Sequence, residues 1–266
     1  MSGSPGIGPK KPNKLIIEPA DLEAGDILLC VGSDRLASIV TAKTKSKYTH
    51  AAICYSPTEV AHIGDKVEKV PTSDFIKDFK YVAVFRGPDF WTEQSLSTLQ
   101  VFIDGKVGTE TSYDEEAARS LMKRQKAHQI ESLGKLREHF EDGVPEPEHD
   151  KVKYVCSEFV TACLAEVGIW GAGMKTGYQP DALHPGNQGH DASFGFLVGF
   201  LQADPAVIIP EDDEFARSMT NGMTYGEWVE VSMDLADNPP QTDQVLSEQE
   251  IQSLLQNLSD NTDANP

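Results

Sequence analysis

The chain has 266 residues with 42 acidic and 23 basic side chains, so its formal net charge at pH 7 is -19. This charge argues against a nucleic-acid binder, which needs clustered Lys and Arg, and against simple adsorption to an anionic membrane. No apolar run approaches the roughly 20 residues of a membrane span. Residues 1–14 lack the apolar core of a signal peptide, and the 4 cysteines show no disulfide spacing. We therefore expect a cytoplasmic protein, with export by an unconventional route left open.

Composition divides the chain into three parts. Residues 1–20 are expected to be a flexible lead with a short strand at Leu15 to Ile17. Residues 21–236 form the expected main domain, because the chain is long enough for one well-buried domain with appendages. Residues 237–266 hold a polar, Pro-containing linker, a short amphipathic helix and a disordered acidic tail.

The first half of the main domain predicts β-strands. Asp26 to Val31 is apolar after its first residue and is expected to be buried on both faces. A hairpin follows, with strands over Tyr48–Tyr55 and Glu59–Ile63 joined by the turn residues Ser56, Pro57 and Thr58. Another strand over Tyr81–Arg86 is rich in β-branched and aromatic residues. These segments predict a small, mostly antiparallel sheet.

The predicted helices lie between and after these strands. A short helix is expected over Asp34–Thr44, a second over Thr92–Lys106, and a long charged one over Asp114–Phe140 with possible breaks. The acidic, Pro-containing loop Glu141–Asp150 then precedes a helix that begins near Cys156. The apolar positions of this last helix recur at helical spacing and are expected to pack on the sheet: Phe159, Val160, Cys163, Leu164 and Val167.

Three residues of this pattern suggest chemistry. Cys156 is expected in the first turn of its helix, where free backbone N–H groups and the helix dipole favour a thiolate. His50 and His62 lie on neighbouring strands of the predicted hairpin and can be neighbours on one face of the sheet. A thiol is only slightly ionised at neutral pH, so a nucleophilic cysteine needs a basic neighbour. The pattern suggests a nucleophile, a base and a polar orienter, with Glu59 as an alternative to His62.

These residues stand within a series of motifs, and in this order the chain resembles the circularly permuted branch of the NlpC/P60 papain-like superfamily. Within that branch it resembles the YiiX-like proteins, from about residue 22 to about residue 185. The lecithin-retinol acyltransferase relatives also place two histidines at this spacing before their cysteine, whereas many YiiX-like chains carry a glutamate at the position of His62. The motifs are Ala24 to Leu29, Thr49-His50, His62, Ser112-Tyr113-Asp114, Tyr154 to Val160 and Gln179 to Leu183.

The resemblance implies an α+β, permuted papain-like fold, in which a small antiparallel sheet packs against the helix that carries the cysteine. It further implies a hydrolase with Cys156 as nucleophile, His50 as base and His62 as orienter, without a metal or cofactor. The acyl-enzyme would be resolved by water, or by an alcohol or amine in an acyltransferase. The bond is an amide in a peptide, such as a cell-wall peptide, or an ester or thioester in a lipid. The alternative of another class is a catalytically idle module that binds a peptide or lipid.

Four further features carry expectations. The apolar run Phe194–Leu201 is either a buried strand that closes the sheet or an exposed surface for lipid. Asp26 and Asp114 are expected to form turn or cap hydrogen bonds. Residues 211–233 are expected to pack on the main domain through Phe215, Tyr225, Trp228 and Val231.

The tail segment Ser247–Leu258 predicts a helix. Ser247 and Glu250 form a capping box, and the apolar stripe that follows needs a surface to cover it. This helix docks on its own domain or on a partner protein. The stripe consists of Ile251, Leu254, Leu255 and Leu258.

Overall fold

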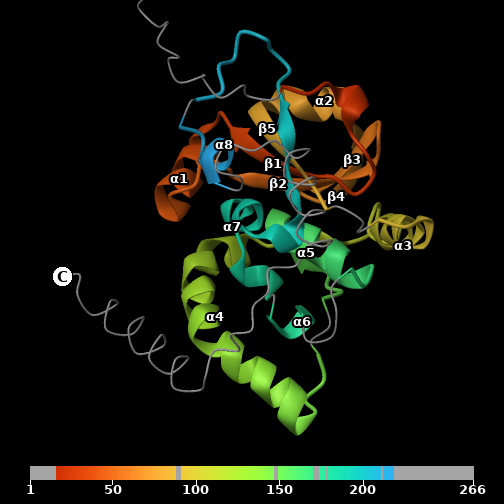
Figure 1. Ribbon diagram of the computed structural model, residues 1–266, viewed down its shortest axis with the longest axis vertical. Helices are drawn as coiled ribbons and strands as arrows, with labels where there is room; N and C mark the ends of the chain where they lie inside the picture. Colours follow the sequence, from red (N-terminus) through yellow and green to blue (C-terminus); the bar gives the residue numbers. More distant parts are fainter. Residues whose placement is uncertain are drawn as a thin grey trace, which may run out of the picture. The chain divides into compact units, whose positions relative to one another are not determined.

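The structure, a computed structural model, describes residues 16–87, 91–146, 149–169, 174–177, 179–210 and 212–218. These residues form a mixed α+β fold around one sheet (Figure 1). The strands of the sheet are β1 (Ile27–Gly32), β2 (His50–Ser56), β3 (Glu59–Ile63), β4 (Val67–Pro71), β5 (Phe79–Arg86) and β8 (Phe196–Leu201). They are arranged in the order β4-β3-β2-β1-β5-β8, and every neighbouring pair is antiparallel.

Helices and a small second sheet occupy the rest of the described chain. The two short strands β6 (Ser112–Tyr113) and β7 (Lys153–Tyr154) pair in parallel. The helices are α1 (Arg35–Thr44), α2 (Thr72–Phe75), α3 (Glu93–Asp104), α4 (Glu115–Asp142), α5 (Cys156–Glu166), α6 (Met174–Gly177), α7 (Pro185–His190) and α8 (Glu214–Ser218). The single-turn 3-10 helices are η1 (Pro19–Asp21), η2 (Ile76–Asp78), η3 (Pro180–Ala182) and η4 (Ala192–Phe194).

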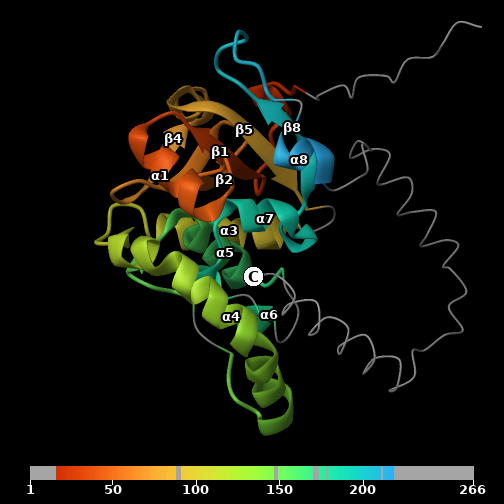
Figure 2. The same ribbon diagram turned by 90° about the vertical axis from the view of Figure 1, so that its left-hand side faces the viewer.

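Both faces of the sheet are buried, because the side chains of the central strand β1 are apolar on both faces. Leu29 of β1 belongs to the cluster that includes Phe159 and Val160 of α5, and Leu28 belongs to the opposite cluster with Phe75 of α2. We name these the α5 face and the α2 face of the sheet. Both views place α5 and α7 between the sheet and α4 (Figures 1 and 2). The prediction that residues 26–31 are buried on both faces is confirmed.

The helices predicted over Asp34–Thr44 and Asp114–Phe140 agree with the structure, as does the expected cap hydrogen bond of Asp114. Asp34 caps α1 by accepting a hydrogen bond from the Ala37 amide, and Asp114 caps α4 through the Ala117 amide. The helix expected over residues 114–140 is one unbroken helix that ends at Asp142. Each helix thus begins with a side chain that satisfies a free backbone N–H group of its first turn.

The strands β4, β6 and β7 were not predicted, and the structure decides between the two alternatives for the apolar run Phe194–Leu201. β4 was not expected, because its residues Glu68 and Lys69 interrupt the apolar pattern; such charges are common on an edge strand. The apolar run that ends at Leu201 forms β8 at the opposite edge, paired with β5, and Phe200 and Leu201 are buried. The buried-strand alternative is therefore confirmed.

Segments beyond the sheet are held by buried polar contacts. The Asp213 carboxylate accepts hydrogen bonds from the hydroxyls of Tyr48, at 3.0 Å, and Tyr81, at 2.8 Å. Phe215 packs on Tyr48, with ring centroids 4.2 Å apart. A Cβ atom at Gly189 of α7 would lie 2.2 Å from the Phe215 ring, so this close packing requires glycine. The expected packing of the chain through Phe215 is confirmed.

Several expectations fall on residues outside the described part. The chain divides into two compact units, Met1–Tyr225 and Gly226–Pro266. Tyr225, Trp228, Val231 and the predicted helix Ser247–Leu258 lie outside the described residues, as does most of the 1–20 lead. Within the described part, no helix combines the length and apolar character needed to cross a membrane.

Candidate active site

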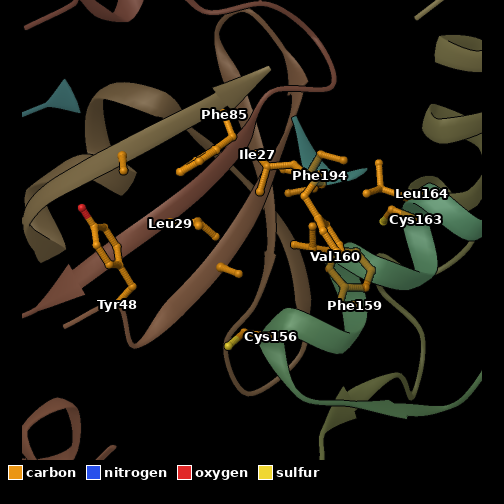
Figure 3. Packing of buried hydrophobic residues seen from close by; sticks show 14 of the residues in the cluster. Ile27, Leu29, Tyr48, Phe85, Cys156, Phe159, Val160, Cys163, Leu164 and Phe194 are labelled. Carbon is orange, nitrogen blue, oxygen red and sulfur yellow. The ribbon is translucent and has the colours of Figure 1, made fainter. Parts of the chain in front are cut away.

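Cys156 is the first residue of α5. The side chain of Glu158 accepts a hydrogen bond from the Val155 amide at 3.2 Å and also binds Lys151 at 2.7 Å, which fixes the start of the helix. Cys156 is 5% exposed and belongs to the α5-face cluster. Figure 3 shows it at the end of α5 that approaches the sheet. The predicted position in the first turn is thus confirmed.

The surroundings of the Cys156 sulfur act in opposite directions on its pKa. Burial is the largest effect and raises the pKa, because the anion would lose its hydration. The backbone amides of Ala51, Ser157 and Cys156 itself lower it by interacting with the thiolate. The net pKa lies above the ordinary value of a thiol, so the resting group is protonated at neutral pH. The expected ready thiolate is not what this arrangement provides.

The Ala51 amide reaches the sulfur because β2 and β3 separate there. Their register runs from Ser56 opposite Glu59 to Ile53 opposite Ala61, where the recorded pairing ends. Ala51 lies beyond this point, on the same α5-face cluster as Cys156. Its N–H group is therefore available to the helix start.

His50 and His62 lie together, as their spacing predicts. His50 begins β2 and His62 lies near the end of β3, and their ring centroids are 5.4 Å apart with the rings nearly perpendicular. The His50 ring stacks on Phe79 at 5.6 Å, and Phe75 lies 5.1 Å from His62. Burial lowers the pKa of His50 to about 3 and also lowers that of His62. Both imidazoles are neutral at pH 7.

The two histidines face away from Cys156. His50 lies directly opposite Cys30, which belongs to the α2-face cluster, whereas Cys156 belongs to the α5-face cluster. Successive side chains of a strand point to opposite faces, so Ala51 lies on the α5 face with Cys156 while the ring of His50 points to the α2 face. In the described structure, Nε2 of His50 and Nδ1 of His62 are buried without a hydrogen-bond partner. The structure brings the two rings together, but not with the thiol.

The carboxylate nearest to the pair is one that the sequence did not indicate. Glu59, the proposed alternative orienter, lies at the far end of β3 opposite Pro71. Glu68 lies directly opposite His62 on β4, and its Oε1 is 3.3 Å from His62 Nε2. Prediction of β4 would have supplied this residue, since opposite positions of an antiparallel pair share a face.

A hollow of about 500 Å³ lies at the start of α4. Its residues come from β6, β7 and α4, and Tyr113 packs against the cluster that contains Cys156. Its lining is largely charged: Tyr113, Asp114, Glu115, Glu116, Arg119 and Lys153. Among the described residues, no group of three or more His, Cys, Asp or Glu could hold a metal ion.

Comparison with known proteins gives a weak likeness in fold to solved structures. No family profile matches the chain, and no curated protein matches it. A solved structure with a similar fold is that of the metalloprotein yiiX from Escherichia coli O157:H7, DUF1105, at 14% identity and a TM-score of 0.38. The similarity covers 55% of this chain and 67% of that one. This likeness does not confirm the permuted NlpC/P60 superfamily or its papain-like fold.

Proposed function

We propose that the chain is a cysteine hydrolase that cleaves an amide or ester bond with Cys156 as nucleophile. One observation carries the proposal: three backbone amides meet at the sulfur of a cysteine in the first turn of a helix. Cys163 provides the contrast, since it lies on the same helix and is fully buried, and its own amide is the backbone group that lowers its pKa against the larger effect of burial. The two thiols therefore differ in anion stabilisation, although both are buried.

The chemistry needs one proton to leave the thiol. The thiolate sulfur would bond to the carbonyl carbon, and the amides of Ala51 and Cys156 are suited to stabilise the oxyanion that develops. Collapse of this intermediate would break the bond to the leaving group and form a thioester, which water would hydrolyse. In this proposal His50 takes the thiol proton. With a pKa of about 3 and a side chain on the α2 face, its imidazole cannot do so in the resting arrangement. The role therefore requires the backbone at the start of β2 to rearrange when substrate binds, because rotation of the side chain alone cannot carry the ring through the sheet.

Mass spectrometry of a bacterial envelope extract tests the proposal. The extract is incubated with the wild-type protein, with Cys156→Ala and with Cys163→Ala as the matched control. New muropeptide fragments in the wild-type and Cys163→Ala samples indicate an amidase, and new fatty acids or lysolipids indicate a lipid acyl hydrolase. An acyl adduct on Cys156 in the intact protein identifies the nucleophile. Absence of any Cys156-dependent product or adduct contradicts the proposal.

Substitution of His50 tests the base separately. His50→Gln removes the proton acceptor but keeps a polar side chain of similar reach. If His50 is the base, turnover falls by about 100-fold or more, while the folded state persists by circular dichroism. Unchanged turnover would assign the proton transfer to another group.

A second candidate is an idle module that binds a peptide or lipid. The observation in its favour is the separation of the imidazoles from Cys156 across the sheet. It predicts that Cys156→Ala binds envelope components as well as the wild-type protein does, with no change in their masses. Product formation that depends on Cys156 contradicts this candidate.

A further inference from the structure

One face of α4 carries large apolar side chains that are exposed. Ile130 and Leu133 are 74% and 76% exposed, Phe140 is 64% exposed and Met122 is 40% exposed. Leu133 and Phe140 are seven residues apart, Ile130 comes three residues before Leu133, and Met122 comes three helical turns before it. All four side chains therefore lie on one side of the helix, and we name them the outer stripe of α4.

The opposite face of α4 holds the helix in the described fold. The Arg124 guanidinium donates to the Asp181 carbonyl of η3 at 2.8 Å, and a Cβ atom at Gly177 of α6 would lie 3.7 Å from the Leu136 side chain. The second half of α4 extends away from the sheet (Figures 1 and 2). The outer stripe belongs to neither cluster of the described core. Large apolar side chains gathered on one exposed face mark an interaction surface.

The charges around the outer stripe are basic, although the formal net charge of the chain is -19. Every charged side chain between residues 119 and 137 is basic except Glu131. Lys126 and Arg137 interleave with the apolar side chains at helical spacing, and Lys123 flanks Met122. Such a surface is complementary to a segment that is both apolar and acidic.

The sequence contains a segment with this chemistry outside the described residues. The predicted helix Ser247–Leu258 has its own apolar stripe, and all charged side chains after Arg217 are acidic. Glu248 and Glu250 stand just before the stripe, in the first turn of the predicted helix. Residues 219–246 can span up to about 90 Å when extended, about twice the length of a helix such as α4, so chain length does not prevent the contact.

We propose that the outer stripe of α4 binds the segment Ser247–Leu258 of this chain. The two apolar stripes would cover each other, and Lys123 and Lys126 would pair with Glu248 and Glu250 at the rim of the contact. The inference goes beyond the proposed hydrolase and does not depend on it, because no step of it involves Cys156.

Two other occupants fit the charges less well. An anionic membrane would attract Lys126 and Arg137, but the net negative charge of the whole chain would oppose its approach. The α4 helix of a second copy would offer an apolar stripe, but it would bring basic side chains against basic ones. An acidic segment meets neither objection.

Zero-length cross-linking of the full chain with a carbodiimide tests the contact, because this reagent joins an ammonium group to a carboxylate only when the two touch. Peptide mass spectrometry should find Lys123 or Lys126 joined to Glu248 or Glu250. Links from the same glutamates to Lys43, an exposed lysine of α1, measure random collision. Equal yields with Lys43 and with the α4 lysines, or no link between α4 and the segment, overturns the inference.

Two substitutions test the apolar part of the contact. Leu133→Gln on α4 and Leu255→Gln in the tail segment each remove one large apolar side chain, so each should lower the yield of the links by about tenfold. The matched control is Val101→Gln, since Val101 of α3 is 70% exposed, and it should leave the yield unchanged. Circular dichroism checks that each variant is folded. A yield that survives both substitutions overturns the inference.

Two further measurements identify the occupant. Cross-linking of an equal mixture of isotopically light and heavy chains shows whether the segment binds α4 of its own chain or of a second copy, and either result supports the inference. Sedimentation with phosphatidylglycerol vesicles tests the membrane. Vesicle binding that is lost with Leu133→Gln, together with no link to the segment, overturns the inference in favour of a lipid surface.

Discussion

The imidazole of His50 meets that of His62 edge to face on the α2 face of the sheet, at a centroid distance of 5.4 Å. Burial lowers both pKa values, so the folded protein holds two neutral rings that the unfolded chain would protonate near pH 6.5. Protonation would place two positive charges side by side among Phe75 and Phe79. The pair should therefore destabilise the fold in acid.

The first prediction is a loss of stability between pH 6.5 and pH 3. The pKa of His50 is lower in the folded state, so its contribution is complete above the unfolded value and is lost as pH falls towards about 3. At about pH 5 we expect the free energy of unfolding to fall by about 1 to 2 kcal/mol. Urea titrations across this range measure it. His50→Phe keeps an aromatic ring against Phe79 and should flatten the dependence; an equally steep dependence would exclude His50 as its source.

The second prediction concerns the hydrogen bonds between the Asp213 carboxylate and two tyrosine hydroxyls. This carboxylate is fully buried and accepts hydrogen bonds from Tyr48 and Tyr81. Tyr48→Phe or Tyr81→Phe should each lower the free energy of unfolding by about 1 to 2 kcal/mol. The double variant should lose more than the sum, because it leaves a buried carboxylate with too few donors. Chemical denaturation measures all three, and a strictly additive result would contradict the coupling.

Tyr55→Phe is the control for the two substitutions of tyrosines that bind Asp213. The Tyr55 hydroxyl donates to Asp104 at 3.0 Å, but this bond is exposed to water. Water can replace it, so the substitution should change stability by less than about 0.5 kcal/mol.

The third prediction concerns the ion pair between Arg86 and Asp26. Asp26 is 1% exposed and accepts two hydrogen bonds from the Arg86 guanidinium, at 2.7 Å each. Asp26→Asn removes one of two carboxylates that pair with Arg86, the other being Glu23 at 2.6 Å, and should cost about 1 to 3 kcal/mol because the hydrogen bonds to a buried charged group are weakened. The matched control is Asp74→Asn, since Asp74 is 63% exposed in its pair with Lys77. Melting temperatures of both variants check this, and equal small shifts would show that burial does not matter here.

Local sequence signals placed most of the elements of the described fold. Apolar spacing predicted the helices over residues 34–44 and 92–106, and a long charged helix was predicted over residues 114–140. In the structure each follows an N-cap side chain: Asp34, Thr92 and Asp114. The edge strand β4 was not predicted, because its charged residues, which face water on one side, interrupt the apolar pattern. Its place in the sheet depends on pairing with β3, which is a tertiary contact. The permuted papain-like fold itself stays a prediction.

The site was predictable in part. The hairpin pattern correctly predicts that His50 and His62 are neighbours, because they belong to adjacent strands and their rings lie on the same face of the sheet. Which face carries the cysteine helix depends on how α5 packs on the sheet, and no local pattern encodes that choice. Neighbouring residues of a strand face opposite sides of the sheet. Ala51 therefore lies on the α5 face with the thiol, whereas His50 lies on the other face. The triad therefore stays a prediction.

The last prediction is that Cys156 reacts slowly with iodoacetamide near neutral pH. Burial raises the pKa of this thiol above its ordinary value, so the thiolate fraction at pH 7 is small, and the sulfur is shielded by the α5-face cluster. The alkylation rate should rise steeply only above about pH 9. Because the His50 ring lies across the sheet, His50→Gln should leave the rate unchanged in the resting protein. Peptide mass spectrometry of timed samples measures each cysteine, with Cys163 as the buried reference.

The opposite result would be informative about catalysis. Fast labelling of Cys156 at about pH 6 that slows with His50→Gln requires an imidazole in contact with the sulfur. That contact would contradict the resting arrangement described above and show that the rings already occupy the α5 face in solution. Slow labelling that becomes fast only when a substrate analogue binds would instead place the movement of His50 within the reaction cycle, since burial alone would keep the thiol protonated until the ring arrives.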